Sequence, residues 1–242
     1  MDVTVILNAH AEGSLAHFSC LSLKEAIDYA SQMGLKVDAI AVLDSPTKET
    51  IDYFNEMSYP WLSIHYVDYA DPGLSRNHGA NLANGDYIAF LDADDLWGYN
   101  WIYDAYRFSQ QQNSNIICHP DISFYFGNHV HYFCHTASNE PSFFKWELAI
   151  TNYWTSAIFL KKILFLNTPH IESDIKNGFG YEDWQWNCET VAKGIEHVTI
   201  KNTVHFIRSK SNGVLSKSNN NNCVLPPTSL FDPDIISEKQ KN

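Results

Sequence analysis

The sequence of 242 residues is poor in positive charge. It has 16 lysine and arginine residues against 28 aspartate and glutamate residues, which gives a formal net charge of -12 at pH 7. A protein whose main partner is nucleic acid needs a surplus of Lys and Arg to neutralise the phosphate backbone. We therefore expect no nucleic-acid partner, whereas carboxylates that act with a divalent cation on a diphosphate are compatible with this balance.

Cysteine is scarce, and long hydrophobic runs are lacking. The five cysteines are widely spaced and form no C-x-x-C pair, which is typical of reduced packing residues rather than of a disulfide framework. We find no secretion signal, and no stretch approaches the ~20 apolar residues of a membrane helix. We therefore expect a soluble, cytoplasmic protein. The cysteines are Cys20, Cys118, Cys134, Cys188 and Cys223.

Several motifs of common enzyme classes are also missing. The absence of G-x-G-x-x-G and of a phosphate-binding loop weighs against dinucleotide oxidoreductases and ATPases. The absence of G-x-S-x-G weighs against a serine hydrolase. Histidines and cysteines gather between residues 118 and 135, but their spacing fits no standard zinc site.

The residues that are present predict a folded α/β domain. The hydrophobic fraction is 45%, and apolar runs of strand length occur at residues 3–7, 37–43, 62–67 and 87–91. Phe18, Leu21, Ala26, Ala30 and Met33 recur at roughly helical spacing between the first two runs. This order is typical of βαβ units with a mainly parallel sheet, whose ligands bind beyond the carboxyl ends of the strands.

After residue 100 the pattern changes. We expect a helix over 101–112, a hairpin within 116–133, a strand running into a short helix over 154–165, a helix over 181–193 and one or two strands over 195–207. From residue 217 the sequence is rich in Ser, Asn and Pro. We expect one catalytic domain over 1–216 and a weakly ordered tail or linker over 217–242.

The strongest chemical signal is the acidic run after the fourth predicted strand. Asp92 and Asp94, separated by one residue at the end of a buried strand, can meet one hard cation and the ligand that it holds. The alternative is a solvated acidic turn that caps the next helix.

The surrounding residues carry a family resemblance. Residues 73–79, which read G-x-x-R-N-x-G, followed by residues 85–95, are similar to the stretch of inverting family 2 glycosyltransferases that leads into their D-x-D strand. The resemblance implies a GT-A type fold with a mixed, mostly parallel sheet flanked by helices.

The resemblance also implies roles for three residues. Asp92 is expected to contact the ribose or diphosphate of a nucleotide-sugar donor, Asp94 to ligate Mn²⁺ or Mg²⁺, and Arg76 to help hold the nucleotide. From the residues alone, Arg76 at a helix start can equally be a structural fork that pairs with Asp71 or Asp86.

Two further strand ends resemble base-binding turns of the family. In residues 8–12 only Glu12 matches the family pattern, and His10 replaces an aromatic ring expected near the base. Asp44 falls at a position that hydrogen-bonds the base. We expect all three to bind the donor. A polar turn at His10 and an N-cap at Asp44 for the helix beginning near Thr47 are the alternatives.

Residues 180–186 resemble the acceptor-side E-D motif. Asp183 is the expected catalytic base, Glu182 is expected to orient it or bind the acceptor, and Trp184 and Trp186 to offer a sugar platform. An acidic first turn favoured by the helix dipole is the alternative. Near the end, Lys210 stands where many relatives have His, so we expect it to neutralise the leaving diphosphate. An exposed basic loop is the alternative.

Together these expectations describe a metal-dependent, inverting glycosyltransferase of surface polysaccharide synthesis. Its donor is a nucleotide sugar, with a UDP-sugar favoured, and its acceptor a glycan or lipid-linked glycan. The resemblance is also compatible with a protein that acts at the inner face of the membrane together with other glycan-synthesis enzymes. The rival hypothesis is a non-catalytic GT-A-like module of a larger synthase that binds nucleotide or glycan. A sugar nucleotidyltransferase fits less well, because residues 9–13 form no Gly-rich basic loop.

Overall fold

Strands and helices alternate in the first half of the chain, as the sequence predicts. The computed structural model describes residues 1–211 and 213–233. All four apolar runs form strands. The elements are β1 (Val3–Ala9), α1 (Ala16–Gln32), β2 (Val37–Asp44), α2 (Lys48–Met57), β3 (Leu62–Val67), α3 (Pro72–Leu82) and β4 (Tyr87–Asp92), with the 3-10 turn η1 (Gly13–Leu15) before α1.

The second half mixes short and long strands. The predicted hairpin turns after Gly127, and the segment predicted as one or two strands forms a single long one. The elements are β5 (Leu96–Trp97), α4 (Trp101–Gln110), β6 (Ile116–Gly127), β7 (His131–Cys134), η2 (Lys145–Ala149), β8 (Phe159–Lys161), α5 (Lys162–Leu166), η3 (Ile175–Asn177), α6 (Glu182–Ala192) and β9 (Glu196–Ser209), followed by α7 (Val214–Asn220) and η4 (Ser229–Phe231).

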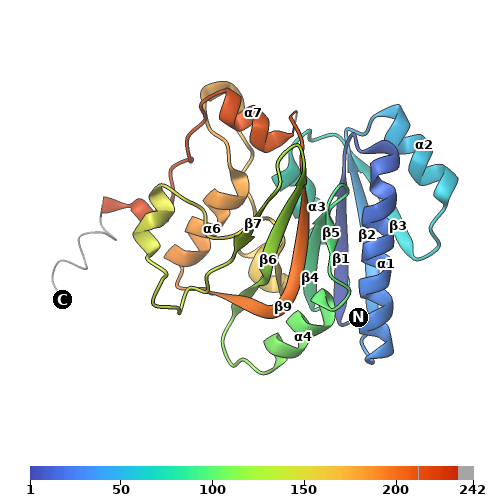
Figure 1. Cartoon of the computed structure of the whole chain (residues 1–242), viewed down its shortest axis with the longest axis horizontal. Helices are drawn as coiled ribbons and strands as arrows, with labels where there is room; N and C mark the ends of the chain where they lie inside the picture. The colour runs from blue at the N-terminus through green and yellow to red at the C-terminus, as the bar shows by residue number, and fades with distance from the viewer. Residues whose placement is uncertain (212, 234–242) are drawn as a thin grey trace.

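The described strands join in one nine-stranded sheet (Figure 1). Its order is β3-β2-β1-β4-β8-β6-β9-β5, with β7 paired to β6 beside this path. The pairs among β1, β2, β3 and β4 are parallel, as is β6 with β9, whereas β5, β7 and β8 pair antiparallel with their neighbours. The predicted mixed, mostly parallel sheet is therefore confirmed.

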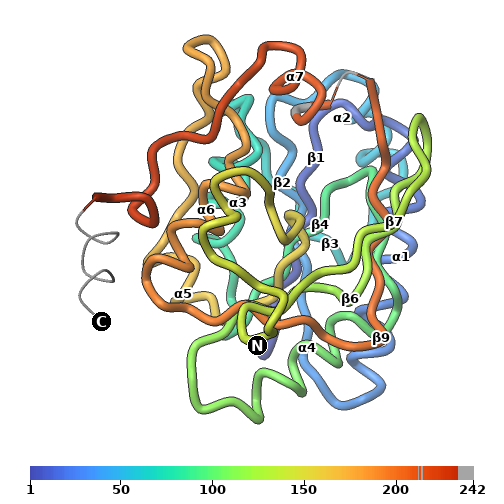
Figure 2. Tube along the Cα trace, turned by 60° about the vertical axis from the view of Figure 1, so that its left-hand side comes forward, coloured from blue at the N-terminus to red at the C-terminus, as the bar shows by residue number. Residues whose placement is uncertain are grey.

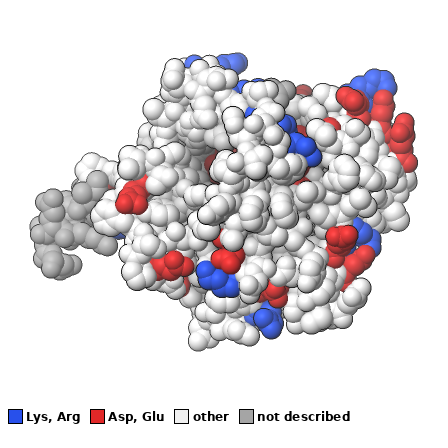
Figure 3. All heavy atoms as spheres, viewed as in Figure 1, with Lys and Arg blue, Asp and Glu red and all other residues white. Residues whose placement is uncertain are grey.

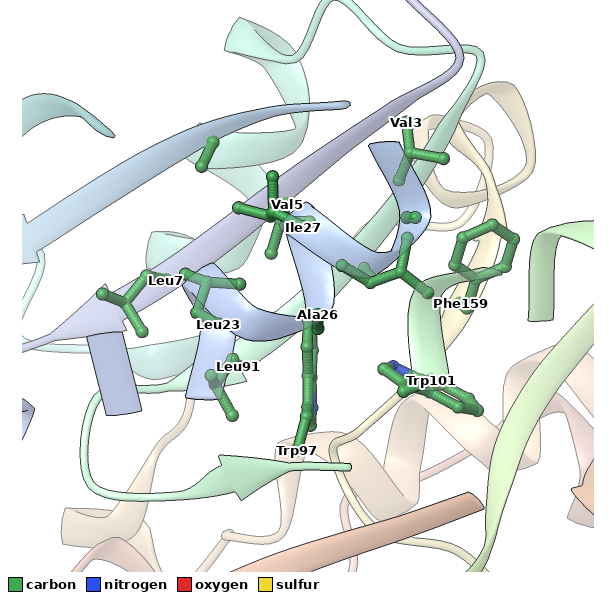
Figure 4. Close-up of a cluster of buried hydrophobic side chains, with 14 of the residues drawn as sticks. Val3, Val5, Leu7, Leu23, Ala26, Ile27, Leu91, Trp97, Trp101 and Phe159 are labelled. Carbon is green, nitrogen blue, oxygen red and sulfur yellow. The ribbon is translucent and has the colours of Figure 1, made fainter. Parts of the chain in front are cut away.

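Helices cover both faces of the sheet. Along β1, Val5 and Leu7 pack into the core under α1 and α4, and Ile6 between them packs into the core on the side of α3, α5 and α6. This alternation follows from the period of two in a strand, and it makes every residue of β1 buried. Figure 4 shows Leu23 and Ile27 of α1 beside the β1 side chains.

The buried face of α1 agrees with the predicted residues at Ala26 and Ala30 but not at the larger ones. Phe18, Leu21 and Met33 are largely exposed, and the residues that pack on the sheet are small ones with Leu23 and Ile27. Small side chains let α1 pack closely against the sheet. The largest apolar residues of the helix are therefore not the ones that face the core.

Helix α3 approaches β1 closely. A Cβ on Gly79 would lie 2.5 Å from Cγ2 of Ile6, which is too short for any side chain. The glycine predicted at this helical position therefore fixes the distance between α3 and the strand that it covers.

The segment after β9 continues along the domain (Figures 1 and 2). Leu230 of η4 is fully buried in a small cluster with Leu148, Trp154 and Cys188. The expected tail thus contains packed residues, while 212 and 234–242 lie outside the described residues, so the division at 216 stays a prediction. Among the described residues, no helix combines the length and apolarity needed to cross a membrane. All five cysteines are free.

Candidate active site

The predicted donor-side residues meet at one edge of the sheet. β1 lies between β2 and β4, and its Asn8 is paired with Asp92 at the end of β4. Glu12 and His10 follow β1, and Asp44 closes β2. Parallel strands end at the same edge, so residues far apart in the sequence come together there.

A buried guanidinium joins the two acidic motifs. Arg76 of α3 is 3% exposed. Its Nη2 donates to both carboxylate oxygens of Asp92, at 2.9 and 3.0 Å, and its Nη1 donates to Oε1 of Glu182 at 3.2 Å. The structural alternative for Arg76 named Asp71 or Asp86 as partners, and both are wrong: Asp71 instead caps α3 by accepting from the Leu74 amide.

The acceptor-side motif forms the first turn of α6. Burial, followed by the charge of Asp183, raises the pKa of Glu182 to about 7, although Arg76 acts in the opposite direction. Burial also raises the pKa of Asp183, again opposed by Arg76. Oδ1 of Asp183 accepts from the Trp184 amide at 2.8 Å, a contact that orients the carboxylate at the helix N-terminus. A carboxylate with a raised pKa is a better proton acceptor than an exposed one.

The side chain of Lys210 sits between two carboxylates. Its Nζ lies 2.6 Å from Oδ2 of Asp94 and 3.5 Å from Oε1 of Glu12. Burial and the neighbouring Asp95 raise the pKa of Asp94 to about 7, while Lys210 lowers it. The expected metal ligand and the expected diphosphate-neutralising lysine are thus in direct contact.

Asp95 ties this acidic turn to β9. Its Oδ1 accepts from the Arg208 amide at 2.8 Å, and its Oδ2 lies 3.2 Å from Nε2 of His205. Nε of Arg208 donates to the carbonyl of Asp94 at 3.3 Å. Asp95, His205 and Arg208 lie within the sequence motifs, but the sequence analysis gave them no roles. Asp95 and its two partners are more than a hundred residues apart along the chain, so their contact could not be seen there.

Asp44 and His10 hold the loops beside the site. The Asp44 carboxylate accepts from the amides of Tyr69, Ala70 and Asp71 at 2.7 to 3.0 Å. Nδ1 of His10 lies 2.7 Å from the Asp44 carbonyl. The N-cap alternative for Asp44 is wrong, because the residue that caps α2 is Thr47. The donor-binding roles of His10 and Asp44 stay predictions.

The two tryptophans of α6 differ in exposure. Trp186 is 1% exposed and packs between Phe165 and His170, so its expected role as a sugar platform is wrong. Trp184 is partly exposed and donates from Nε1 to the Leu148 carbonyl at 2.8 Å. Its indole is therefore anchored to η2, and the acceptor contact expected for it stays a prediction.

Two residues near the acids were missed in the sequence. Burial, then the charges of Asp183 and Asp95, raise the pKa of Tyr125 in β6 to about 12. Oγ of Ser156 donates to Asp92 at 3.4 Å. Neither belongs to a recognisable motif, and Tyr125 lies opposite Ile207 of β9 in the sheet.

A comparison with models of known protein families identifies the family of the chain. The model of the family described as glycosyl transferase family 2 matches residues 8–166, which is more than half of the chain. The chain belongs to glycosyl transferase family 2. The matched part contains the predicted donor-side residues of β1, β2, α3 and β4, and it ends before Glu182 and Asp183.

Similar proteins agree with this family. Poly(ribitol-phosphate) beta-glucosyltransferase of Bacillus spizizenii is 30% identical over 83 residues, which are 33% of this chain and 13% of that protein. Residues 1–349 of S. aureus TarS, in complex with UDP-GlcNAc, superpose with a TM-score of 0.68 at 15% identity, over 89% of this chain and 61% of that one. The chain therefore spans only part of both relatives.

An archaeal structure extends the likeness. The mannosyltransferase PcManGT from Pyrobaculum calidifontis, in complex with GDP-Man and Mn²⁺, superposes with a TM-score of 0.60 at 15% identity, over 88% of this chain and 58% of that one. At this identity the likeness concerns the fold, and it confirms the GT-A type architecture expected from the sequence.

Proposed function

We propose that this family 2 chain transfers a sugar from a nucleotide-diphosphate sugar to an acceptor hydroxyl, with inversion at the anomeric carbon. A glycan or lipid-linked glycan of surface polysaccharide synthesis is the proposed acceptor class. The relatives support this assignment: TarS is in complex with UDP-GlcNAc, and the Bacillus spizizenii protein is named for a poly(ribitol-phosphate) substrate.

The observation that carries the proposal is the shared guanidinium of Arg76. It binds Asp92, on the donor side, and Glu182, next to the proposed base Asp183. An inverting reaction needs the base on the face of the sugar opposite the leaving group, so the donor and acceptor motifs must be neighbours across one sugar. A single side chain in contact with both motifs supports that arrangement.

The mechanism follows from the proposed roles. Asp183 accepts the proton of the acceptor hydroxyl while the oxygen of that hydroxyl forms a bond to the anomeric carbon. The bond between that carbon and the diphosphate breaks, and the electron pair leaves with the nucleoside diphosphate. In this proposal Lys210, which contacts Asp94, neutralises the departing diphosphate, and Arg76, which contacts Asp92, helps to hold the nucleotide.

A divalent cation fits the donor set of the site. Carboxylates outnumber cations around Asp94, and their oxygens are hard ligands suited to Mn²⁺ or Mg²⁺. Asp94 would hold the ion, which supplies charge neutralisation for the diphosphate when bound. In the described part of the chain, no three metal-ligating side chains already converge on one point, so further ligands would come from the donor. Metal dependence is thus part of the proposal.

A binding panel followed by one substitution tests the function. Thermal shifts with UDP, GDP, dTDP and CMP, each with and without Mn²⁺, identify the base and the metal requirement. With the matching nucleotide sugar, Asp183→Asn should lower turnover by about 10²- to 10⁴-fold, because proton transfer is lost. Donor affinity measured by calorimetry should stay unchanged.

Asp28→Asn is the matched control. Asp28 is an exposed aspartate of α1 that pairs with Lys24, so its loss should leave turnover unchanged. Full activity of Asp183→Asn would remove Asp183 as the base. Nucleotide binding without transfer or donor hydrolysis, over a broad acceptor panel, would instead favour the non-catalytic module.

A further inference from the structure

A small cavity lies beside the proposed base. It has a volume of about 10 Å³, and the residues that line it include Arg76 of α3, Thr155 in the segment before β8 and Asp183 of α6. A water needs roughly 10–15 Å³ of such space, so the cavity fits one water at most and excludes a sugar ring or a phosphate group. The roles proposed for Arg76 and Asp183 do not account for it.

Two of these residues carry a buried polar atom that lacks a partner. In the described part of the chain, no group forms a hydrogen bond with Nε of Arg76 or with Oγ1 of Thr155. Arg76 is 3% exposed and Thr155 is 9% exposed. On the face shown in Figure 3, Lys and Arg are scattered among Asp and Glu at the surface, where water satisfies their N–H groups. A buried N–H or hydroxyl without a partner instead bears the full cost of its desolvation.

The neighbours of Thr155 hold it in position. The ring of Trp154 stacks on that of His197, with 4.0 Å between the ring centres, and its Nε1 donates to the Thr136 carbonyl. On the other side, Oγ of Ser156 donates to Asp92. Because Thr155 lies between two anchored residues, its hydroxyl has little freedom to reach a partner elsewhere.

The three polar groups are complementary to one water. Nε of Arg76 can only donate, the ionised carboxylate of Asp183 can only accept, and the hydroxyl of Thr155 does either. A water that accepts from Arg76 and donates to the other two makes three hydrogen bonds, which is the usual number for a buried water. The walls also include Ile158 and Trp186, and the Trp186 N–H already donates to the Thr168 carbonyl.

We propose that the cavity binds one water, which joins Arg76 and Thr155 to the carboxylate of Asp183 and thereby positions the base. The inference rests on the proposed function and deepens it. Thr155 acts on Asp183 through the water without touching the substrates, so it is a positioning residue. Together with the Trp184 amide, which donates to Oδ1 of Asp183, the water holds the carboxylate in one orientation.

The water also acts on the proton affinity of the base. Burial raises the pKa of Asp183, and a hydrogen bond donated to its charged form opposes that rise. The substitution of the Thr155 hydroxyl alters none of the titratable or charged groups around this carboxylate. A shift in the acidic limb of the pH profile therefore reports on the water. These groups are Arg76, Asp92, Glu182, Tyr125 and His170.

Thr155→Val, which replaces the hydroxyl with a methyl group of similar size, tests the site. The midpoint of the acidic limb of kcat/KM against pH should move up by about 0.5 to 1 pH unit, because the water loses a partner and stabilises the carboxylate less. Turnover below that midpoint should fall by about 3- to 10-fold. Donor affinity measured by calorimetry should stay unchanged. Thr155→Ser keeps the hydroxyl and should restore the parent profile.

Thr228→Val is the matched control. Thr228 precedes η4, and its Oγ1 is also buried without a partner among the described residues, but it does not line the cavity. The same change there should leave the pH profile as it is. Without a bound water, a methyl group in place of the Thr155 hydroxyl should be neutral or stabilising. An unchanged pH profile of Thr155→Val would therefore overturn the site.

A crystal structure of the parent protein separates this site from the proposed function. We expect electron density for a water bonded to Nε of Arg76 and to Oγ1 of Thr155. A dry cavity would overturn the inference even in an active enzyme. A parent protein that transfers no sugar from any donor would instead reject the proposed function, and the density alone would then decide whether the water is bound.

Discussion

The two halves of the molecule satisfy their buried titratable groups in different ways. In the parallel half, Asp44 is 5% exposed and its carboxylate accepts three backbone amides, while Asp71 accepts from the amides of Leu74 and Ser173. Amide donors stabilise the charged form of a carboxylate. The amide contacts of these buried acids shape the loops under the donor side.

The second half buries imidazoles instead. His119 and His197 are stacked and share a hydrogen-bonding contact of 2.8 Å, and the Trp154 ring lies 4.0 Å from that of His197. Burial lowers the pKa of His135 and of His197 to about 3, and it lowers the pKa of His119 as well. The difference is between carboxylates held by backbone amides in the first half and imidazoles kept neutral by burial in the second.

Arg76 is where the two halves meet, so its removal should have the largest effect. Arg76→Ala leaves Asp92 and Glu182 without their buried cation, which should lower the free energy of unfolding by about 3–5 kcal/mol. Urea unfolding measures this change. Arg107→Ala, on the exposed face of α4, should change it by less than about 0.5 kcal/mol. A loss below about 1 kcal/mol for Arg76→Ala would show that the halves are not coupled through this ion pair.

The same contrast explains what the sequence could and could not predict. Strands β1, β2 and β4 are largely buried on both faces and β3 at the edge only in part, so their apolar runs were visible. The acids at their ends lie together because parallel strands end together. The partners of Arg76 were not predictable, since Glu182 reaches it from α6 across many intervening elements.

Local sequence patterns were misleading where long-range packing determines the surroundings of a side chain. Trp186 resembles a sugar platform in the sequence, but the direction of α6 turns it into the core while Trp184 stays partly exposed. The role of Lys210 toward the diphosphate stays a prediction, but its contacts with Asp94 and Glu12 could not be read from the local sequence. Motif spacing identifies residue types, whereas long-range register determines their partners.

The second-largest expected effect is a loss in the free energy of unfolding of the histidine-rich half as the pH falls. An imidazole that stays neutral when folded but is protonated when unfolded lowers stability by about 1.4 kcal/mol per pH unit below about 6.5. For His197 this loss runs from about 6.5 down to its folded pKa of about 3. The raised pKa values of Asp94 and Glu182 act oppositely, since these groups bind protons more readily when folded, and stability gains as pH falls through 7.

A substitution separates the two contributions. His197→Gln should reduce the slope of unfolding free energy against pH, measured by urea unfolding between pH 6 and pH 4, by about 1.4 kcal/mol per pH unit. The slope is the readout because the substitution also removes contacts with His119 and Thr190 at every pH. His129→Gln, at an exposed position, should leave the slope unchanged. An equal slope in both variants would assign the acid sensitivity elsewhere.

The smallest expected effect belongs to the parallel half. Asp44→Asn turns one carboxylate oxygen into an amide group that cannot accept from Tyr69, Ala70 or Asp71, so at least one buried donor loses its partner. We expect a loss of about 1–3 kcal/mol in the free energy of unfolding. The three donors are backbone amides, which do not titrate, so the loss should stay constant between pH 6 and pH 8. The slope change of His197→Gln begins only at the lower end of this range. A loss that varies over this range would mean that the anion of the first half is coupled to the titrating groups of the second.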